Sequence, residues 1–226
     1  MALEDGIRDQ DTEAERPLPD IPSATVGRLI LYARELQRLR REGQTHVSSG
    51  ELGVLLSVSD AVVRRDVSYL GQMGRRGVGY EVGPLIHQIR ETMGTNVKWK
   101  VALIGAGSLG TALIRYRGFS EQGFELVAAF DSDPARWSQS IAGVPILPSE
   151  DIESTIHKLD VQLAILAVPG EVAGAIAARL CKTGVAGILN FAPVPLQKDP
   201  RVCVVNVDLA SELQQLSFAV VKQMRD

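Results

Sequence analysis

Short helices separated by turn residues are the pattern of the N-terminal part of the chain. A stripe of apolar side chains at helical spacing predicts a helix over residues 24–42, which Gly43 can end. Ser48 and Glu51 form a capping-box pattern that starts a second helix, expected to run to about Leu56. The side chains expected to face inward on these two helices are those of Leu29, Tyr32, Ala33, Leu36, Leu39, Leu52, Leu55 and Leu56.

A third helix, over residues 61–70, carries arginines in the middle of its length. Ser59 is placed to cap it, and the tight turn of residues 57–60 joins it to the helix before. Two short helices joined in this way, the second bearing Arg64 and Arg65, predict a helix-turn-helix whose second helix enters a DNA major groove. The alternative is a solvated basic face on a small three-helix core.

A glycine-rich segment follows the third helix. In residues 71–79 four glycines flank two arginines, and residues 78–80 resume as an extended strand. This arrangement predicts a β-wing with Arg75 and Arg76 at its tip, a shape suited to a DNA minor groove. An exposed turn without a ligand is the alternative. Pro84 then fits the first turn of a further helix that ends near residue 93.

After residue 96 the pattern changes to buried strands that alternate with helices. The run at residues 143–147 is expected at the edge of the sheet, and Ser149 is expected to cap the helix after it. A last helix, residues 208–224, is apolar on several faces, which favours a dimer interface over a solvated surface. The predicted strands cover residues 101–104, 126–130, 143–147, 162–168, 187–191 and 202–207.

These changes of pattern predict an α/β fold with a defined order of domains. An N-terminal winged-helix DNA-binding domain precedes a Rossmann-type doubly wound parallel sheet, and a terminal dimerisation helix follows. The expected ranges are 1–20 for a disordered acidic tail, 21–95 for the winged helix, 96–207 for the Rossmann domain and 208–226 for the last helix.

The chemistry of the second domain centres on the loop after its first strand. Gly105, Gly107 and Gly110 have G-x-G-x-x-G spacing: the first permits a tight turn, the second admits a pyrophosphate, and the third lets helix and strand pack closely. Asp131 ends the next strand, where its carboxylate can bind both ribose hydroxyls and repel a 2′-phosphate. The pattern predicts NAD(H), with a packing turn that binds nothing as the alternative. The loop residues assigned to the site are Gly105, Ala106, Gly107, Ser108, Leu109 and Gly110.

Two later loops are expected beside the same cofactor. Loops at the carboxyl ends of parallel strands face the ligand. These loops offer apolar walls and no acid to the nicotinamide, so the neutral ring of NADH is expected to be accepted and the cation of NAD⁺ disfavoured. The residues assigned are Val168, Pro169, Asn190, Phe191, Ala192 and Pro193.

Charge and composition change this picture in two ways. The net charge of −3 hides a division: residues 21–98 carry eleven bases and seven acids, whereas residues 1–20 carry two bases and seven acids. The net-basic segment is the predicted helix-turn-helix, which supports DNA as its partner. Cys181 and Cys203 have no metal or redox spacing, and neither a membrane span nor a signal peptide is apparent. A cytoplasmic protein without a metal site is therefore expected.

Taken in order, the motifs resemble the Rex family of NADH-sensing bacterial transcriptional repressors. The resemblance covers about residues 21–224, and it departs at Leu70, where the family often has Phe, and at Ser108, where it often has Asn. It implies a homodimer that binds an inverted-repeat operator and leaves it when NADH binds. The motifs that carry it are Ile21–Thr25 with Arg28–Leu29, Val47–Ser49, Arg64–Asp66, Ser68–Tyr69, Gly77–Tyr80, Gly105–Gly110, Phe130–Asp131, Gly187–Phe191 and Asn206–Leu209.

The resemblance also assigns residues to DNA binding and to a switch. It implies that Arg34, Tyr116 and Asp208 exchange partners, with Asp208 paired to Arg34 in one state and to the Tyr116 hydroxyl in the other. The residues assigned to DNA, from the motifs and the resemblance together, are Ser48, Ser59, Arg64, Arg65, Ser68, Tyr69, Arg75, Arg76 and Gly77.

Two other functions stay open at this point. An NAD-dependent dehydrogenase needs a substrate domain and a proton-relay residue, but His46, His87 and His157 lie outside the predicted cofactor loops and no Tyr-x-x-x-Lys occurs. No catalytic residue is therefore assigned. A CoA-binding regulatory domain would have a similar sheet. Asp131 favours a ribose without a phosphate but does not decide the matter.

Overall fold

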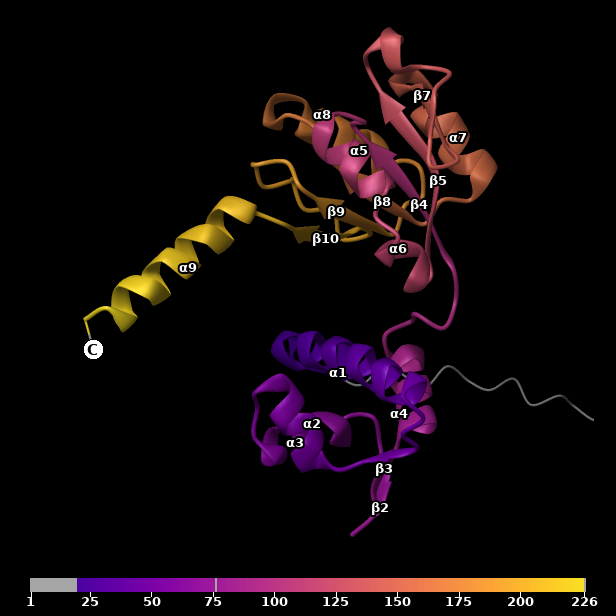
Figure 1. The fold of residues 1–226 in the computed structure, drawn as a ribbon. Coiled ribbons are helices and arrows are strands. Elements are labelled where there is room, and N and C mark those ends of the chain that lie inside the picture. The colour runs from indigo at the N-terminus through magenta and orange to yellow at the C-terminus, as the bar shows by residue number, and fades with distance from the viewer. Residues whose placement is uncertain (1–19, 76, 226) are drawn as a thin grey trace, which may run out of the picture. The chain divides into compact units, whose positions relative to one another are not determined.

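The computed structural model describes residues 20–75 and 77–225 of the chain. The expected disordered tail, apart from Asp20, and the wing residue Arg76 therefore lie outside the described residues. The chain divides into two compact units between Asn96 and Val97, and each is described by itself (Figure 1).

The first unit is a winged helix, as predicted. In its described part four helices enclose an apolar core that includes Leu29, Leu36, Leu52 and Val63, and three short strands pair antiparallel in the order β1-β3-β2 (Figure 1). The elements are α1 (Ser23–Arg41), β1 (His46–Val47), α2 (Ser49–Leu56), α3 (Asp60–Ser68), β2 (Gly74–Arg75), β3 (Gly79–Glu81) and α4 (Val82–Thr92).

Side-chain caps define the helix-turn-helix, and this prediction is confirmed. The Ser48 hydroxyl accepts a hydrogen bond from the Glu51 amide, and the Glu51 carboxylate accepts one from the Ser48 amide, which completes a capping box. Ser59 accepts a hydrogen bond from the Val62 amide at the start of α3. Both helices therefore begin where the sequence places their caps.

Two predictions for this unit were wrong in detail. Leu55 is exposed, not inward, because α2 has only two turns and Gly53 takes the inward place. A Cβ at Gly53 would lie 2.6 Å from the Val58 carbonyl oxygen, so the following turn packs directly on the helix backbone. Val78 lies in the wing turn and not in a strand, since its amide donates to the Arg75 carbonyl. Strand β1 was not predicted, because two residues are too few to show a pattern.

The second unit is built on a doubly wound sheet, as predicted. Within the described residues the strand order is β10-β9-β8-β4-β5-β7-β6, and all pairs are parallel except β6 with β7. The strands are β4 (Trp99–Ile104), β5 (Phe124–Asp131), β6 (Ser140–Ile141), β7 (Val144–Pro148), β8 (Leu163–Leu166), β9 (Gly187–Asn190) and β10 (Cys203–Asn206).

Helices cover both faces of this sheet (Figure 1). One core includes Ile104, Phe130 and Leu166 with α7 and α8, and the other includes Leu103 with α5 and α6. The chain order reverses between β4 and β8, which makes the carboxyl ends of these two strands the expected ligand position in such a sheet. The helical elements are α5 (Ser108–Ile114), α6 (Gly118–Glu121), η1 (Pro134–Arg136), η2 (Ser149–Asp151), α7 (Ile152–Leu159), α8 (Gly170–Leu180) and α9 (Leu209–Gln223).

Two predictions for the second unit were wrong. The strand predicted over residues 143–147 is not the edge of the sheet, because the short strand β6 pairs with it on the outer side. Ser149 does not cap the next helix. It starts the 3₁₀ turn η2, and α7 follows without a side-chain cap. Its carbonyl instead accepts a hydrogen bond from Arg179.

The terminal helix α9 lies within the range predicted for it, residues 208–224, and Asp208 caps its start. The Asp208 carboxylate accepts hydrogen bonds from the amides of Ala210 and Ser211. No residue of α9 is buried in the described chain, although it carries large apolar side chains. Exposed apolar residues of this helix are Leu209, Leu213, Leu216, Phe218, Val220 and Val221.

Candidate nucleic-acid interface and dinucleotide site

The recognition helix α3 presents a polar face to solvent. Arg64, Arg65 and Ser68 are exposed, whereas Val63 and Val67 are buried in the core. Spacings of three and four residues place the exposed side chains on one side of the helix. Tyr69 is half-buried at the C-cap, and the Ser68 hydroxyl donates to the Arg65 carbonyl oxygen at 2.6 Å.

A buried carboxylate ties α3 to α1. Asp66 is 1% exposed and accepts hydrogen bonds from Arg28 Nε at 2.6 Å and Nη2 at 2.8 Å, from Tyr32 at 2.9 Å and from Thr25 at 3.1 Å. Burial alone would raise the pKa of Asp66, but these hydrogen bonds outweigh it and lower the pKa. Burial and the bond to Asp66 raise the pKa of Tyr32. The network therefore fixes the orientation of the recognition helix α3 relative to α1.

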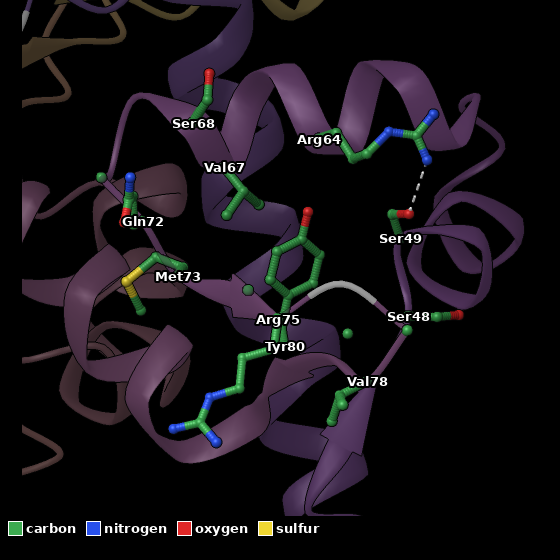
Figure 2. A pocket seen from close by; sticks show the side chains of 14 residues that line it. Ser48, Ser49, Arg64, Val67, Ser68, Gln72, Met73, Arg75, Val78 and Tyr80 are labelled. Carbon is green, nitrogen blue, oxygen red and sulfur yellow. Dashed lines mark hydrogen bonds between the residues drawn. The ribbon is translucent and has the colours of Figure 1, made fainter.

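A groove of about 650 Å³ lies between α3 and the wing. Arg64 lines it, and its Nη1 lies 3.3 Å from Ser49 Oγ at the start of α2 and 2.6 Å from Asp60 Oδ2 in its own helix. Figure 2 shows the Tyr80 ring at the centre of the groove, with the Arg64 and Arg75 guanidinium groups on opposite sides of it. The groove thus joins the helix and the wing into one basic surface.

The wing is a hairpin with a glycine at its turn. Gly74 pairs with Tyr80 and Arg75 with Gly79, and Gly77 has a φ of +81° in the turn between them. Gly79 approaches β1 closely, since a Cβ there would lie 2.5 Å from the Val47 carbonyl oxygen. Arg75 is exposed. The described part of the hairpin therefore has the shape expected of a wing.

In the second unit the glycine loop follows β4. Gly105 has a φ of +96°, and a Cβ on Gly110 would collide with the Gly105 carbonyl oxygen. A Cβ on Gly107 would meet nothing within 4 Å, and Ser108 and Leu109 are exposed at the start of α5. The first and third glycines are thus required by the protein's own packing, whereas the second faces open space.

The carboxylate of Asp131 is tied to the same loop. Oδ2 accepts a hydrogen bond from the Ala106 amide and Oδ1 from the Asp133 amide, both at 2.9 Å. The Asp131 side chain keeps 12% of its surface exposed. The sequence predicts that the glycine loop and this acid act together, and the structure brings them into contact.

The other assigned loops lie at the carboxyl ends of β8 and β9. Val168 packs on the core beneath the glycine loop, and Pro169 precedes α8. Phe191 is half-buried and Pro193 exposed, whereas Ala192 is buried. Asn190 is 1% exposed; its amide group donates to Val194 O and Asn206 Oδ1, and its carbonyl oxygen accepts from the Ala192 amide. Its side chain therefore shapes the loop.

Two residues without a local sequence signal, Asp66 and Arg136, support the two sites. Asp66 was read only as part of a motif, and its partners Thr25 and Tyr32 lie 41 and 34 residues away. Arg136 was not assigned to the cofactor site, yet its Nη1 donates to the Ala106 carbonyl oxygen at 2.6 Å. No local signal reveals either contact, because each depends on side chains that meet only in the folded chain.

The three residues of the suggested switch are described one by one. Asp208 caps α9, and its carboxylate also accepts a hydrogen bond from the Ser211 hydroxyl at 2.6 Å. Tyr116 is exposed and packs edge-on against Phe119, with ring centroids 5.1 Å apart. Arg34 is exposed on α1. Among the described residues no group of His, Cys, Asp and Glu could hold a metal ion, and none of the described helices is long and apolar enough to cross a membrane.

These features define the class of protein: a winged-helix DNA-binding domain joined to a nucleotide-binding type of sheet. Two family models match in that order, the "Putative DNA-binding protein N-terminus" over residues 20–68 and the "CoA binding domain" over residues 96–194. Each model therefore covers one part of the chain.

Comparison with curated relatives identifies the family. The redox-sensing transcriptional repressor Rex of Rhodopirellula baltica is 48% identical over 95% of this chain and 89% of its own length. The Rex of Carboxydothermus hydrogenoformans is 42% identical over 88% and 96%. The chain belongs to the Rex family of redox-sensing transcriptional repressors.

Solved structures agree with this assignment. RSP, described as a Rex-family repressor, was crystallised with β-NAD⁺ and operator DNA. That structure has a TM-score of 0.85 at 30% identity and covers 90% of this chain and 94% of RSP. The complex of RSP with β-NADH gives a TM-score of 0.80 at 29% identity, with 91% and 96% covered.

Proposed function

We propose that this protein represses transcription by binding an inverted-repeat operator as a homodimer and leaves the operator when NADH binds. The observation that carries the proposal is that one chain joins the basic face of α3 beside a wing to a glycine loop with open space at Gly107. Residues 21–95 then form the DNA-binding domain, residues 96–207 the NAD(H) domain and residues 208–226 the dimerisation helix.

The described residues fit a dinucleotide. The open space at Gly107 admits a pyrophosphate, and no side chain caps the first amides of α5, which leaves them available to it. Asp131 lies at the end of β5, where its partly exposed carboxylate can take the hydroxyls of a ribose. These contacts are the same for NADH and NAD⁺, so they supply affinity without redox discrimination.

Discrimination is assigned to the loops after β8 and β9. When bound, the cofactor differs only at its nicotinamide, which is neutral in NADH and cationic in NAD⁺. Val168, Pro169, Phe191, Ala192 and Pro193 offer no carboxylate to a cation, and burial of an unpaired charge is unfavourable. We therefore expect NADH, and not NAD⁺, to close the two cofactor domains around the dimer interface. Closing would move the two recognition helices away from the separation that the operator half-sites require.

DNA recognition is assigned to Ser48, Ser59, Arg64, Arg65, Ser68 and Tyr69 in the major groove and to Arg75, Arg76 and Gly77 at the wing. Two-fold symmetry of a dimer calls for half-sites one or two helical turns apart. Replacing Arg64, Arg65 or Arg76 by Ala is expected to weaken operator binding by about 1–3 kcal/mol where the residue reads a base edge. Unchanged binding by Arg76→Ala would show that the wing assignment is wrong.

The function is tested by adding each cofactor to an operator complex while fluorescence anisotropy reports bound DNA. Release by NADH at concentrations where NAD⁺ has no effect is the expected result. Equal release by both forms, or tighter binding with NADH, contradicts the proposal. No substrate is supplied in this assay, because we infer that the protein is a regulator without catalysis. We also infer that it acts in the cytoplasm, where its DNA is.

For the switch, we propose that Asp208 pairs alternately with Arg34 and Tyr116.

A second ligand is favoured by one observation, the match of residues 96–194 to the CoA binding domain. The adenosine of CoA carries a 3′-phosphate, which would approach the Asp131 carboxylate and be repelled by it. We therefore expect CoA to compete poorly with NADH. Displacement of bound NADH by an equal concentration of CoA would favour CoA as the ligand.

A further inference from the structure

A short turn after Asp131 presents Arg136 in a fixed position. The Asp133 carboxylate accepts a hydrogen bond from the Ala135 amide at 3.0 Å, which caps the turn Pro134–Arg136. The Trp137 indole donates to the Asp131 carbonyl oxygen at 2.8 Å. The backbone on both sides of Arg136 is therefore tied to the end of β5.

The Arg136 guanidinium spans the two parts of the candidate adenosine site. Nη1 donates to the Ala106 carbonyl oxygen at 2.6 Å, and Nε lies 3.8 Å from Asp131 Oδ2 and 3.6 Å from Asp133 Oδ2. Ala106 also donates its amide to Asp131 and accepts a bond from the Thr111 hydroxyl at 3.0 Å. Asp131 and Arg136 thus bind the amide and the carbonyl of the same loop residue.

The charges around this guanidinium decide what it can bind. The Asp131 carboxylate is the acid assigned to the ribose hydroxyls, so it is the one that a 2′-phosphate would meet, and it repels that phosphate. A guanidinium has several donors in a fixed plane that matches phosphate geometry, and Arg136 is 39% exposed. Loss of the Asp131 charge would leave one acid and one base, with donors available toward the ribose.

We propose that Asp131 and Arg136 act as a pair that sets the choice between NADH and NADPH. Asp131 restrains the Arg136 guanidinium and excludes a 2′-phosphate, and once Asp131 is neutralised Arg136 becomes the ligand of that phosphate. Arg136 is therefore a specificity-determining residue of the site. This inference rests on the proposed binding of NAD(H).

The test compares dissociation constants of NADH and NADPH for the full chain and four variants, read from energy transfer between the tryptophans, Trp99 and Trp137, and the reduced nicotinamide. Asp131→Asn is preferred to Ala because the amide oxygen can still accept the Ala106 amide. It is expected to bind NADPH about 10- to 100-fold tighter than the unmutated chain, the range of a hydrogen bond to a charged group. Arg136→Gln should keep the preference for NADH.

The double variant Asp131→Asn/Arg136→Gln is expected to bind NADPH more weakly than Asp131→Asn, because the repulsion by Asp131 stays absent while the Arg136 contact is lost. Asp133→Asn is the matched control, since it removes the other neighbouring acid and should keep the preference for NADH within about threefold. NADPH binding by the double variant equal to that of Asp131→Asn would overturn the inference, as would a switch of preference in Asp133→Asn. Failure of the unmutated chain to bind NADH would overturn the proposed function as well, so the two failures are distinguishable.

Discussion

Asp66 is a single carboxylate that fixes the position of the recognition helix α3 against α1. It is buried between α1 and α3 and accepts hydrogen bonds from Arg28, Tyr32 and Thr25. Arg28 keeps 31% of its side chain exposed, so part of the ion pair is screened by solvent. Replacing the carboxylate by an amide removes its charge and one of the two acceptor oxygens that Arg28, Tyr32 and Thr25 share.

Asp66→Asn is therefore expected to destabilise the first unit by about 2–3 kcal/mol at pH 7. Hydrogen exchange of α1 and α3 amides in the full chain measures the change. Asp60→Asn on the same helix is the control, because Asp60 is half exposed and its pair with Arg64 lies on the surface; a loss below about 1 kcal/mol is expected. Equal losses in both variants would contradict the role given to Asp66.

The pH dependence of this contribution follows from the direction of each pKa shift. The pKa of Asp66 is lowered on folding, so its stabilisation is present above the ordinary carboxyl pKa of about 4 and is lost as pH falls through the folded value. The pKa of Tyr32 is raised, so its contribution is present below about pH 10 and is lost as pH rises through the folded value. Thermal melting should show the unmutated chain and Asp66→Asn converging in acid.

At the scale of elements, much of the organisation could be predicted because local patterns specify it. Serine caps set the starts of α2 and α3, and the glycine spacing predicts the turn between β4 and α5. Sequence patterns do not predict an element that is very short, or the burial of a side chain where contacts between elements determine it. Strand β6 has two residues, and Leu55 turns outward because Gly53 lets the next turn take its place. Arg136 escaped prediction because its partner Ala106 lies 30 residues away.

The contact between α5 and the end of β4 depends on the smallest side chain. In Gly110→Ala the added methyl would meet the Gly105 carbonyl oxygen, which the loop backbone cannot easily move. We expect a loss of about 1–3 kcal/mol in stability and a weaker affinity for NADH. Gly174→Ala in α8 is the control, because its Cβ meets nothing within 4 Å and stability should rise by about 0.4–1 kcal/mol. Unfolding in urea and NADH titration measure both effects.

Helix α9 is expected to hold the dimer together, by inserting between the two domains of the partner. Its exposed apolar side chains would be unfavourable in water over the whole length of the helix. Truncation after Val207 should therefore give monomers with little operator affinity in sedimentation and anisotropy measurements. Leu216→Glu should weaken the dimer, whereas Gln215→Glu on the same helix tests the added charge alone. A truncated chain that still sediments as a dimer would contradict this role.

At the scale of the whole molecule, the proposed function couples two binding sites. A ligand shifts a balance between two states only by its difference in affinity for them, and a change from 1:99 to 99:1 requires about 5.5 kcal/mol. By linkage, operator DNA must weaken NADH binding by the factor with which NADH weakens operator binding. Titration of NADH into the free protein and into its operator complex measures one factor, and operator titration with and without NADH measures the other. Unequal factors would show that a further state takes part.

The tie between Asp66 and α1 has a consequence for the operator itself. Because the Asp66 network holds α3 rigidly on α1, we expect NADH to change the distance between the two recognition helices of the dimer and not the bases that each helix contacts. The length of DNA between the half-sites then sets the NADH concentration at which the repressor leaves the operator. Promoters that share half-sites but differ by a base pair in their spacer would then be released at different NADH concentrations. Different genes would be switched on at different ratios of NADH to NAD⁺ by the same protein.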